Sequence, residues 1–141
     1  MITAVDTNVL LDLLTADRKQ GESSREAIRA CLAEGSLVAC PVVWTEVSSF
    51  FRPDPKVGGE ALERLGVRFV PLGMEAAMKA ARCWQAYRAA QDAVRRVAAD
   101  FLIGGHAMMH ADRLLTRDRG FFRGYFQGLQ VLDPSAGPPA A

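Results

Sequence analysis

The first segment of the chain, MITAVDTNVLLDLL (Met1–Leu14), decides the fold. An apolar run extends from Met1 to Val5 and stops at the carboxylate of Asp6, after which leucines recur at helical spacing. This pattern predicts a buried strand, a tight turn and a helix, with Asp6 at the carboxyl end of the strand. In open α/β sheets, ligands bind at that edge. An Asp at this position can also serve only as the N-cap of the following helix, so this segment alone leaves both roles open.

Short apolar segments alternate with longer segments of helical periodicity along the rest of the chain. The further strands are expected at residues 37–39, 67–71, 113–116 and 129–132. The further helices are expected at 23–34, 42–51, 60–65, 74–91 and 99–111, with a turn over 120–126. Strands that alternate with helices predict an α/β fold with a parallel sheet. We therefore predict one domain over residues 1–133 and a flexible Pro/Gly/Ala-rich tail over residues 134–141.

Composition sets broad limits on the class of protein. The chain has 141 residues, 50% of them hydrophobic, which suits a single core. Residues 1–70 carry 8 Lys and Arg against 10 Asp and Glu, whereas residues 71–141 carry 9 against 6. A phosphate-binding surface would draw on the second half, although a solvated helix face explains the same bias. Three cysteines without CxxC spacing, no signal-peptide pattern and no apolar run of membrane-spanning length favour the cytoplasm.

Three further acids occupy unusual positions. Glu46 falls on the apolar face of its predicted helix, and so does Asp100, beside Gly104, where a neighbouring backbone could approach closely. Asp118 follows the fourth predicted strand, as Asp6 follows the first. Each acid alone has an ordinary explanation as a surface residue or a helix cap. All four together are harder to explain, since buried unpaired charge costs free energy that a shared divalent cation would offset.

Four segments, in this order and at these spacings, resemble the motifs of PIN domains, most closely those of VapC-type ribonuclease toxins. The segments are Asp6-Thr7-Asn8-Val9-Leu10, Glu46, Asp100-Phe101-Leu102-Ile103 with Ala107, and Thr116-Arg117-Asp118 with Phe121. The resemblance implies a PIN-like three-layer α/β fold with a parallel sheet of about five strands in the order 3-2-1-4-5. It also implies a metal-dependent endoribonuclease that acts as the toxin of a type II toxin–antitoxin pair, with an antitoxin partner and a homodimer.

The resemblance also assigns roles to individual residues. Asp6, Glu46, Asp100 and Asp118 would be the catalytic metal ligands, directly or through water. Ligands that are all oxygen favour Mg²⁺ or Mn²⁺ over zinc. Such a cation would also relieve a repulsion of about 4 kcal/mol between two charges roughly 4 Å apart at a dielectric constant of about 20. Two neighbouring polar residues, Asn8 and Thr116, are expected to orient the carboxylates or water.

Basic residues near the last two acids are candidates for RNA contact. We select Arg95, Arg96 and Arg117 because the planar guanidinium suits phosphate, although a surface ion pair is the alternative for each. His106 and His110 have the i, i+4 spacing of paired metal ligands. No Glu lies between them in an HExxH pattern, so we interpret both as structural or exposed.

Two other classes of function compete with the nuclease. One is a noncatalytic PIN-like interaction module, and the other is a phosphoacceptor signalling domain with a magnesium pocket. The signalling domain would need a Lys at a late strand end, where the second half of the chain offers only Lys79 inside a predicted helix. A dinucleotide-binding enzyme is disfavoured because no glycine-rich loop follows the first strand. Apolar side chains that could meet a partner, unless they belong to the core, are Trp44, Phe50, Phe51 and Trp84.

Overall fold

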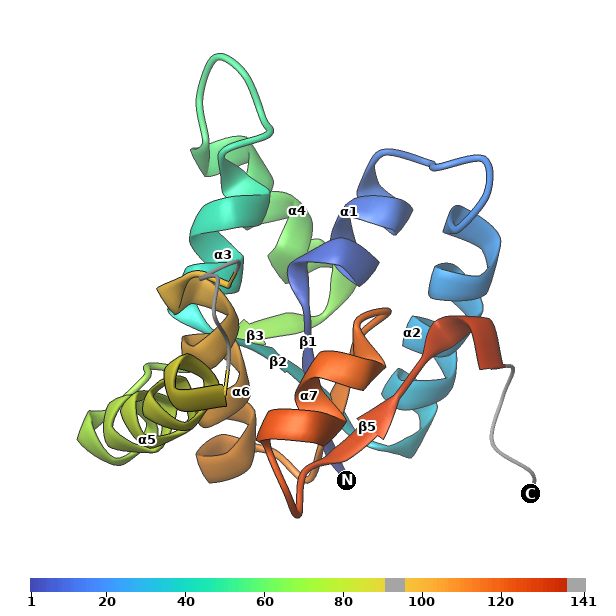
Figure 1. Ribbon diagram of the computed structural model, residues 1–141. Coiled ribbons are helices and arrows are strands. Elements are labelled where there is room, and N and C mark those ends of the chain that lie inside the picture. Colours follow the sequence, from blue (N-terminus) through green and yellow to red (C-terminus); the bar gives the residue numbers. More distant parts are fainter. Residues whose placement is uncertain (91–95, 137–141) are drawn as a thin grey trace.

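The fold is built on one parallel sheet with helices on both faces (Figure 1). The computed structural model describes residues 1–90 and 96–136. Within them, the sheet has the strand order β3-β2-β1-β4-β5, and all neighbouring strands are parallel. The strands are β1 (Ile2–Val5), β2 (Ser36–Ala39), β3 (Val67–Phe69), β4 (Arg113–Leu115) and β5 (Gln130–Leu132). The predicted α/β class and the order 3-2-1-4-5 are therefore confirmed.

Helices connect these strands and cover the sheet. They are α1 (Thr7–Leu14), α2 (Gly21–Glu34), α3 (Pro41–Ser48), α4 (Lys56–Leu65), α5 (Met74–Ala90), α6 (Ala98–His110) and α7 (Arg119–Tyr125), followed by a 3-10 turn (Pro134–Ala136). Figure 1 shows α5 and α6 packed together on one side of the sheet and α2 on the other. None of the helices in the described part of the chain is long and apolar enough to cross a membrane.

The register of the two central strands determines where the site can form. Val5 lies beside Leu115, and the backbone N–H of Asp6 donates to the Leu115 carbonyl at 3.0 Å. Successive connections lead away from β1 in one direction, to β2 and β3, and then return to β4 on its other side. In such sheets ligands bind at this reversal, at the carboxyl ends of the strands. The two central strands, β1 and β4, therefore end side by side at this edge, just before Asp6 and just before Thr116.

Several boundaries differ from the sequence-based expectation. The predicted turn over 120–126 is wrong, because residues Arg119–Tyr125 form α7. Its two glycines lower helix propensity, but Phe121 and Phe122 are buried, so packing outweighs propensity. Helix α3 ends at Ser48 instead of continuing to Phe51, and Phe50 leaves the apolar face with 63% of its surface exposed. Helix α4 begins at Lys56, one turn before the expected start at Glu60.

The C-terminal segment begins with an ordered contact. Pro134 is buried, and the 3-10 turn that it starts packs against α2. Residues 137–141 of the predicted tail lie outside the described residues.

The histidine pair helps to hold one loop onto α6. His106 is fully buried, and its Nε2 lies 2.9 Å from the Val70 carbonyl, while Nε2 of His110 lies 2.8 Å from the Leu72 carbonyl. Burial lowers the pKa of His106, which favours the neutral ring. Both contacts join α6 to the segment that precedes α5, in keeping with the structural role expected from the sequence.

Candidate active site

Asp6 is the most constrained of the predicted site residues. It caps α1, because one carboxylate oxygen, Oδ1, accepts the Thr7 backbone N–H at 2.7 Å. Its other oxygen, Oδ2, accepts the Thr116 hydroxyl at 2.7 Å and the Asn8 amide at 3.3 Å. Only 7% of the residue is exposed. The capping role is therefore real, but it accounts for one of the two oxygens, and the second belongs to a polar network at the sheet edge.

Glu46 reaches the same edge from α3. Pro41 at the first position of this helix suits its start, and Val43 and Val47 on the buried face hold it against the sheet. The Thr7 hydroxyl donates to Oε1 of Glu46 at 2.7 Å, so Glu46 and Asp6 are joined through one residue. Sequence reasoning did not identify Thr7 as a site residue, because its partner lies 39 positions away.

Thr116 joins the carboxyl ends of β1 and β4. Its hydroxyl donates to Asp6 and accepts the backbone N–H of Asp118 at 3.0 Å. Thr116 is fully buried. Asn8 and Thr116, which the sequence proposed as orienting residues, both donate to Oδ2 of Asp6. The hydroxyl fixes the turn that carries Asp118 relative to Asp6.

Asp118 and Asp100 meet at one guanidinium. Arg96 binds Asp118 through both of its terminal nitrogens, with Nη2 3.3 Å from Oδ1, and its Nη1 lies 3.8 Å from Asp100. The guanidinium carbon also lies 4.3 Å from the centre of the Phe121 ring. Arg96 was predicted as an RNA contact on sequence proximity alone. In the structure it is the positive partner of two of the four predicted metal ligands.

The other two predicted RNA-binding arginines have different positions. Arg117 donates to both carboxylate oxygens of Asp12, at 2.7 and 2.8 Å, and Asp12 also accepts the Ser24 hydroxyl at 2.8 Å. Asp12 is only 4% exposed, so this bidentate pair fastens the turn after β4 to α1. Sequence reasoning missed Asp12, which appeared only as a polar position in a helix. Arg95 lies outside the described residues.

Burial makes two of the predicted ligands harder to ionise. Burial is the main cause that raises the pKa of Asp6 to about 6, with Asp100 and Glu46 adding repulsion, while hydrogen bonds from Thr116 and Thr7 oppose the rise. Burial also raises the pKa of Asp100, and the Arg96 charge opposes that rise. Two of the predicted ligands thus resist ionisation, and a nearby cation would favour their charged forms.

The donor set suits a hard divalent cation, although the side chains do not form a compact cluster. Within residues 1–90 and 96–136, no group of three or more His, Cys, Asp or Glu side chains lies close enough together to hold a metal ion. The candidate ligands are nevertheless all carboxylates, which Mg²⁺ and Mn²⁺ accept. Hydrogen bonds from Thr7, Thr116 and Arg96 link them around one edge of the sheet. The donor set therefore fits such an ion in its chemistry, and the four carboxylates lie at the same edge of the sheet without converging on one point.

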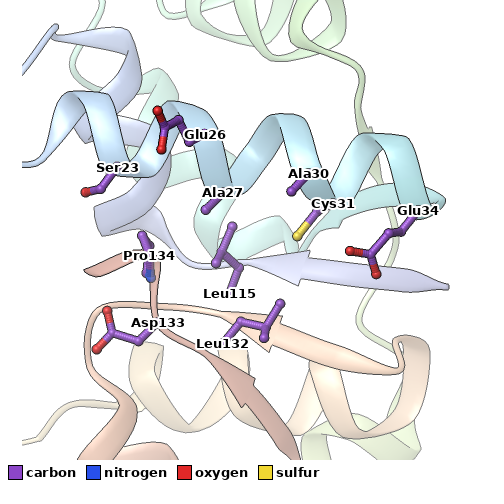
Figure 2. Close-up of a pocket in the computed structure, with 10 residues that line it drawn as sticks. All are labelled: Ser23, Glu26, Ala27, Ala30, Cys31, Glu34, Leu115, Leu132, Asp133 and Pro134. Carbon is purple, nitrogen blue, oxygen red and sulfur yellow. The ribbon is translucent and has the colours of Figure 1, made fainter. Parts of the chain in front are cut away.

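A separate small cavity lies between α2 and the end of the sheet (Figure 2). Its volume is about 80 Å³, and its walls include Ala27, Cys31, Leu115 and Leu132. None of the four predicted carboxylates lines it. Because pockets for small organic ligands usually measure about 300 Å³ or more, this cavity does not fit a nucleotide, and the carboxylates at the sheet edge remain the candidate site.

The sheet order, the switch point and the carboxylates at it define an α/β protein with an acidic site. The family model of the PIN domain matches residues 3–127, and the chain belongs to this family. No curated protein matches the sequence significantly.

Solved structures with the same fold come from toxin–antitoxin complexes and toxins. FitAcB from Neisseria gonorrhoeae is 23% identical with a TM-score of 0.70, and the match covers 96% of this chain and 99% of that one. VapBC2 from Rickettsia felis, bound to a promoter DNA fragment, is 16% identical with a TM-score of 0.68, covering 94% and 98%. VapC20 from Mycobacterium tuberculosis, a Sarcin-Ricin loop cleaving toxin, is 14% identical with a TM-score of 0.59, covering 91% and 98%. At these identities the likeness establishes the shared fold.

Proposed function

We propose that this PIN domain protein is a Mg²⁺- or Mn²⁺-dependent endoribonuclease and the toxin of a type II toxin–antitoxin pair. The observation that carries the proposal is the buried carboxylate of Asp6 at the switch point of the sheet. Hydrogen bonds through Thr7 link it to the Glu46 carboxylate, and hydrogen bonds through Thr116 link it to the backbone N–H of Asp118. A structural cap would not need the second carboxylate. VapC20, a Sarcin-Ricin loop cleaving toxin with the same fold, supports the assignment of RNA as substrate.

The chain's own residues have distinct parts in the proposed reaction. Asp6, Glu46, Asp100 and Asp118 would hold the cation, which would activate water and neutralise charge on the phosphate. Thr7 and Thr116 keep two of these carboxylates in fixed orientations through charge-assisted hydrogen bonds. The Asp12–Arg117 pair holds the turn that presents Asp118. We do not assign Arg117 to RNA contact, because its guanidinium already binds a buried carboxylate.

RNA cleavage should depend on a divalent cation. Purified protein incubated with mixed-sequence RNA should produce internal cuts with Mg²⁺ or Mn²⁺, lose this activity in EDTA, and recover it when the cation is restored. Gel or sequencing analysis of the fragments measures the effect. A Glu46→Gln preparation made in parallel controls for contaminating ribonuclease. Cleavage that persists equally in EDTA and in this variant would contradict the proposal.

The same samples separate the competing functions. A bound cation should stabilise the folded state by about 2.7 kcal/mol at 100 times its dissociation constant, which a melting curve with and without Mn²⁺ detects. A melting temperature indifferent to Mn²⁺, with no cleavage, would favour the noncatalytic interaction module. Stable phosphorylation of the protein by a small phosphodonor would favour the signalling domain. That outcome is not expected, because the positive side chain that contacts Asp118 and Asp100 is Arg96, not a lysine.

We propose that the antitoxin partner covers an apolar groove between α1, α2 and α4. The groove is lined by apolar residues and by three arginines, namely Leu13, Leu14, Ile28, Leu32, Ala61, Leu65, Arg25, Arg29 and Arg64. This combination fits a segment that carries apolar side chains beside carboxylates. Phe50 supplies an exposed aromatic surface elsewhere, whereas Trp44, Phe51 and Trp84 pack against the core, so these three offer less for a homodimer than the sequence suggested.

Expression of this chain alone should arrest growth, and co-expression of its partner should restore it. Changing Arg29 and Arg64 together to Glu should abolish the rescue but not the toxicity. The reason is that the proposed partner binds this groove, whereas the carboxylates of the candidate active site lie outside it. Colony counts after induction, with light scattering to establish the oligomeric state, provide the measurement. A monomeric protein whose expression is harmless would remove the support for the toxin assignment.

A further inference from the structure

Arg96 occupies a position that conflicts with a metal ion. Its guanidinium contacts the carboxylates of both Asp118 and Asp100, which arrive from the turn after β4 and from the first turn of α6. Among the ion pairs of the described residues, Arg96 is the only cation that contacts any of the four predicted metal ligands. The guanidinium has donors but no acceptor, and it stays charged at any physiological pH, so it cannot itself be a metal ligand.

We propose that Arg96 is an internal competitor of the divalent cation, and that the strength of its contacts with Asp100 and Asp118 sets the metal affinity of the site. The inference rests on the proposed function, because it assumes that these carboxylates hold the cation. A cation that takes their oxygens must break or weaken the hydrogen bonds to Arg96 and must also tolerate a positive charge nearby. By linkage, each binding event weakens the other by the same factor.

The surroundings of Arg96 suit it to exchange between two states. The side chains of Arg96, Asp100 and Asp118 are 31%, 29% and 33% exposed, so water can reach the ion pair and replace it. The guanidinium carbon of Arg96 lies over the face of the Phe121 ring, 4.3 Å from the ring centre. This cation–π contact does not depend on the carboxylates. Arg117 differs, because it is fixed on the buried Asp12 by two hydrogen bonds and does not touch the predicted ligands.

The test is Mn²⁺ binding by calorimetry at constant ionic strength, on the full chain without RNA. Arg96→Gln should bind Mn²⁺ on the order of ten-fold more tightly than the parent, a typical coupling between two sites, and Arg96→Lys should fall between them. In EDTA, Arg96→Gln should melt at a lower temperature than the parent, since Asp100 and Asp118 then repel each other without compensation. Saturating Mn²⁺ should raise its melting temperature by more than it raises that of the parent.

The matched control is Arg88→Gln. It also removes one positive charge, but from a side chain that lies over the Trp84 ring at 4.3 Å and has no ion pair with the predicted ligands. It should leave the Mn²⁺ affinity unchanged within about two-fold, because it removes one positive charge without freeing a predicted ligand. Equal affinity of Arg96→Gln and the parent, or weaker binding by Arg96→Gln, would overturn the inference while leaving the metal site in place. Absence of Mn²⁺ binding in the parent as well would overturn the proposed metal site itself.

Discussion

Asp6→Asn should abolish RNA cleavage and weaken Mn²⁺ binding by more than roughly 100-fold. Loss of a partner that only orients a metal ligand typically costs about 10- to 100-fold, and Asp6 would be a ligand itself. Asn keeps one oxygen that can accept the Thr7 N–H, and Asn caps helices about as well as Asp, so α1 should form normally. A neutral amide is nevertheless a poorer ligand for a hard cation than a carboxylate.

The same substitution should stabilise the metal-free protein above pH 6. Burial raises the pKa of Asp6 from 3.8 to about 6, so the folded state holds the proton more tightly than the unfolded chain. The protonated Asp6 carboxyl therefore contributes its full stability to the folded state below about pH 4. This contribution falls as the pH rises towards 6, and it is lost above that pH. A pKa raised from 3.8 to about 6 corresponds to roughly 3 kcal/mol. This is an upper estimate of what Asn can recover, because its amide nitrogen cannot accept the hydrogen bonds from Thr116 and Asn8.

Urea unfolding in EDTA between pH 4 and pH 8 measures this effect as the difference between variant and parent. The difference should grow from pH 4 to pH 6 and then stay level. Asp112→Asn is the matched control, because Asp112 is an exposed acid at the opposite end of β4, where it accepts the backbone N–H of Ile2. The control should keep Mn²⁺ binding and cleavage. An Asp6→Asn protein that binds Mn²⁺ and cuts RNA like the parent would show that Asp6 has a structural role and is not a metal ligand.

The sequence predicted the edge of the sheet better than it predicted the contacts there. Asp6 and Asp118 follow strands whose parallel order was expected, so their common edge follows from topology. Glu46 and Asp100 stood out because they interrupt the apolar faces of periodic helices. These four positions depend on local patterns, which a single sequence carries.

The contacts between these residues depend on tertiary packing. The Thr7–Glu46 hydrogen bond spans 39 positions and the Arg96–Asp118 pair spans 22, and no local rule connects such residues. Helix α7 was missed for a related reason. Its sequence contains two glycines in seven residues, and it is held by the buried Phe121, whose ring packs against Phe101 of α6 and Tyr87 of α5. Sequence periodicity cannot reveal a helix whose stability comes from its neighbours.

The two adjacent glycines of α6 also have tertiary contacts that the sequence did not predict. A close approach to another backbone was expected at Gly104, but there an added Cβ would meet the Phe126 ring at 2.4 Å. The backbone approach occurs at Gly105, where an added Cβ would lie 2.4 Å from the Ala76 carbonyl oxygen of α5. The helical pattern indicated that a small residue was needed in this turn, but not which neighbour each glycine meets.

Gly105→Ala should therefore destabilise the protein by about 1–3 kcal/mol, the usual cost of overpacking a core, despite the better helix propensity of Ala. The new methyl would meet the α5 backbone at the Ala76 carbonyl oxygen and the Ala80 nitrogen, at 2.4 and 3.1 Å, and neither atom can move without the helix. Because α6 carries Asp100 in its first turn, displacement of this helix should also weaken Mn²⁺ binding.

Gly120→Ala in α7 is the matched control: no atom lies within 4 Å of its added Cβ, so it should be neutral or stabilising by up to about 1 kcal/mol. Thermal unfolding of both variants in EDTA and in Mn²⁺ measures the two effects, and a Gly105→Ala protein as stable as Gly120→Ala would mean that α5 and α6 can separate at little cost.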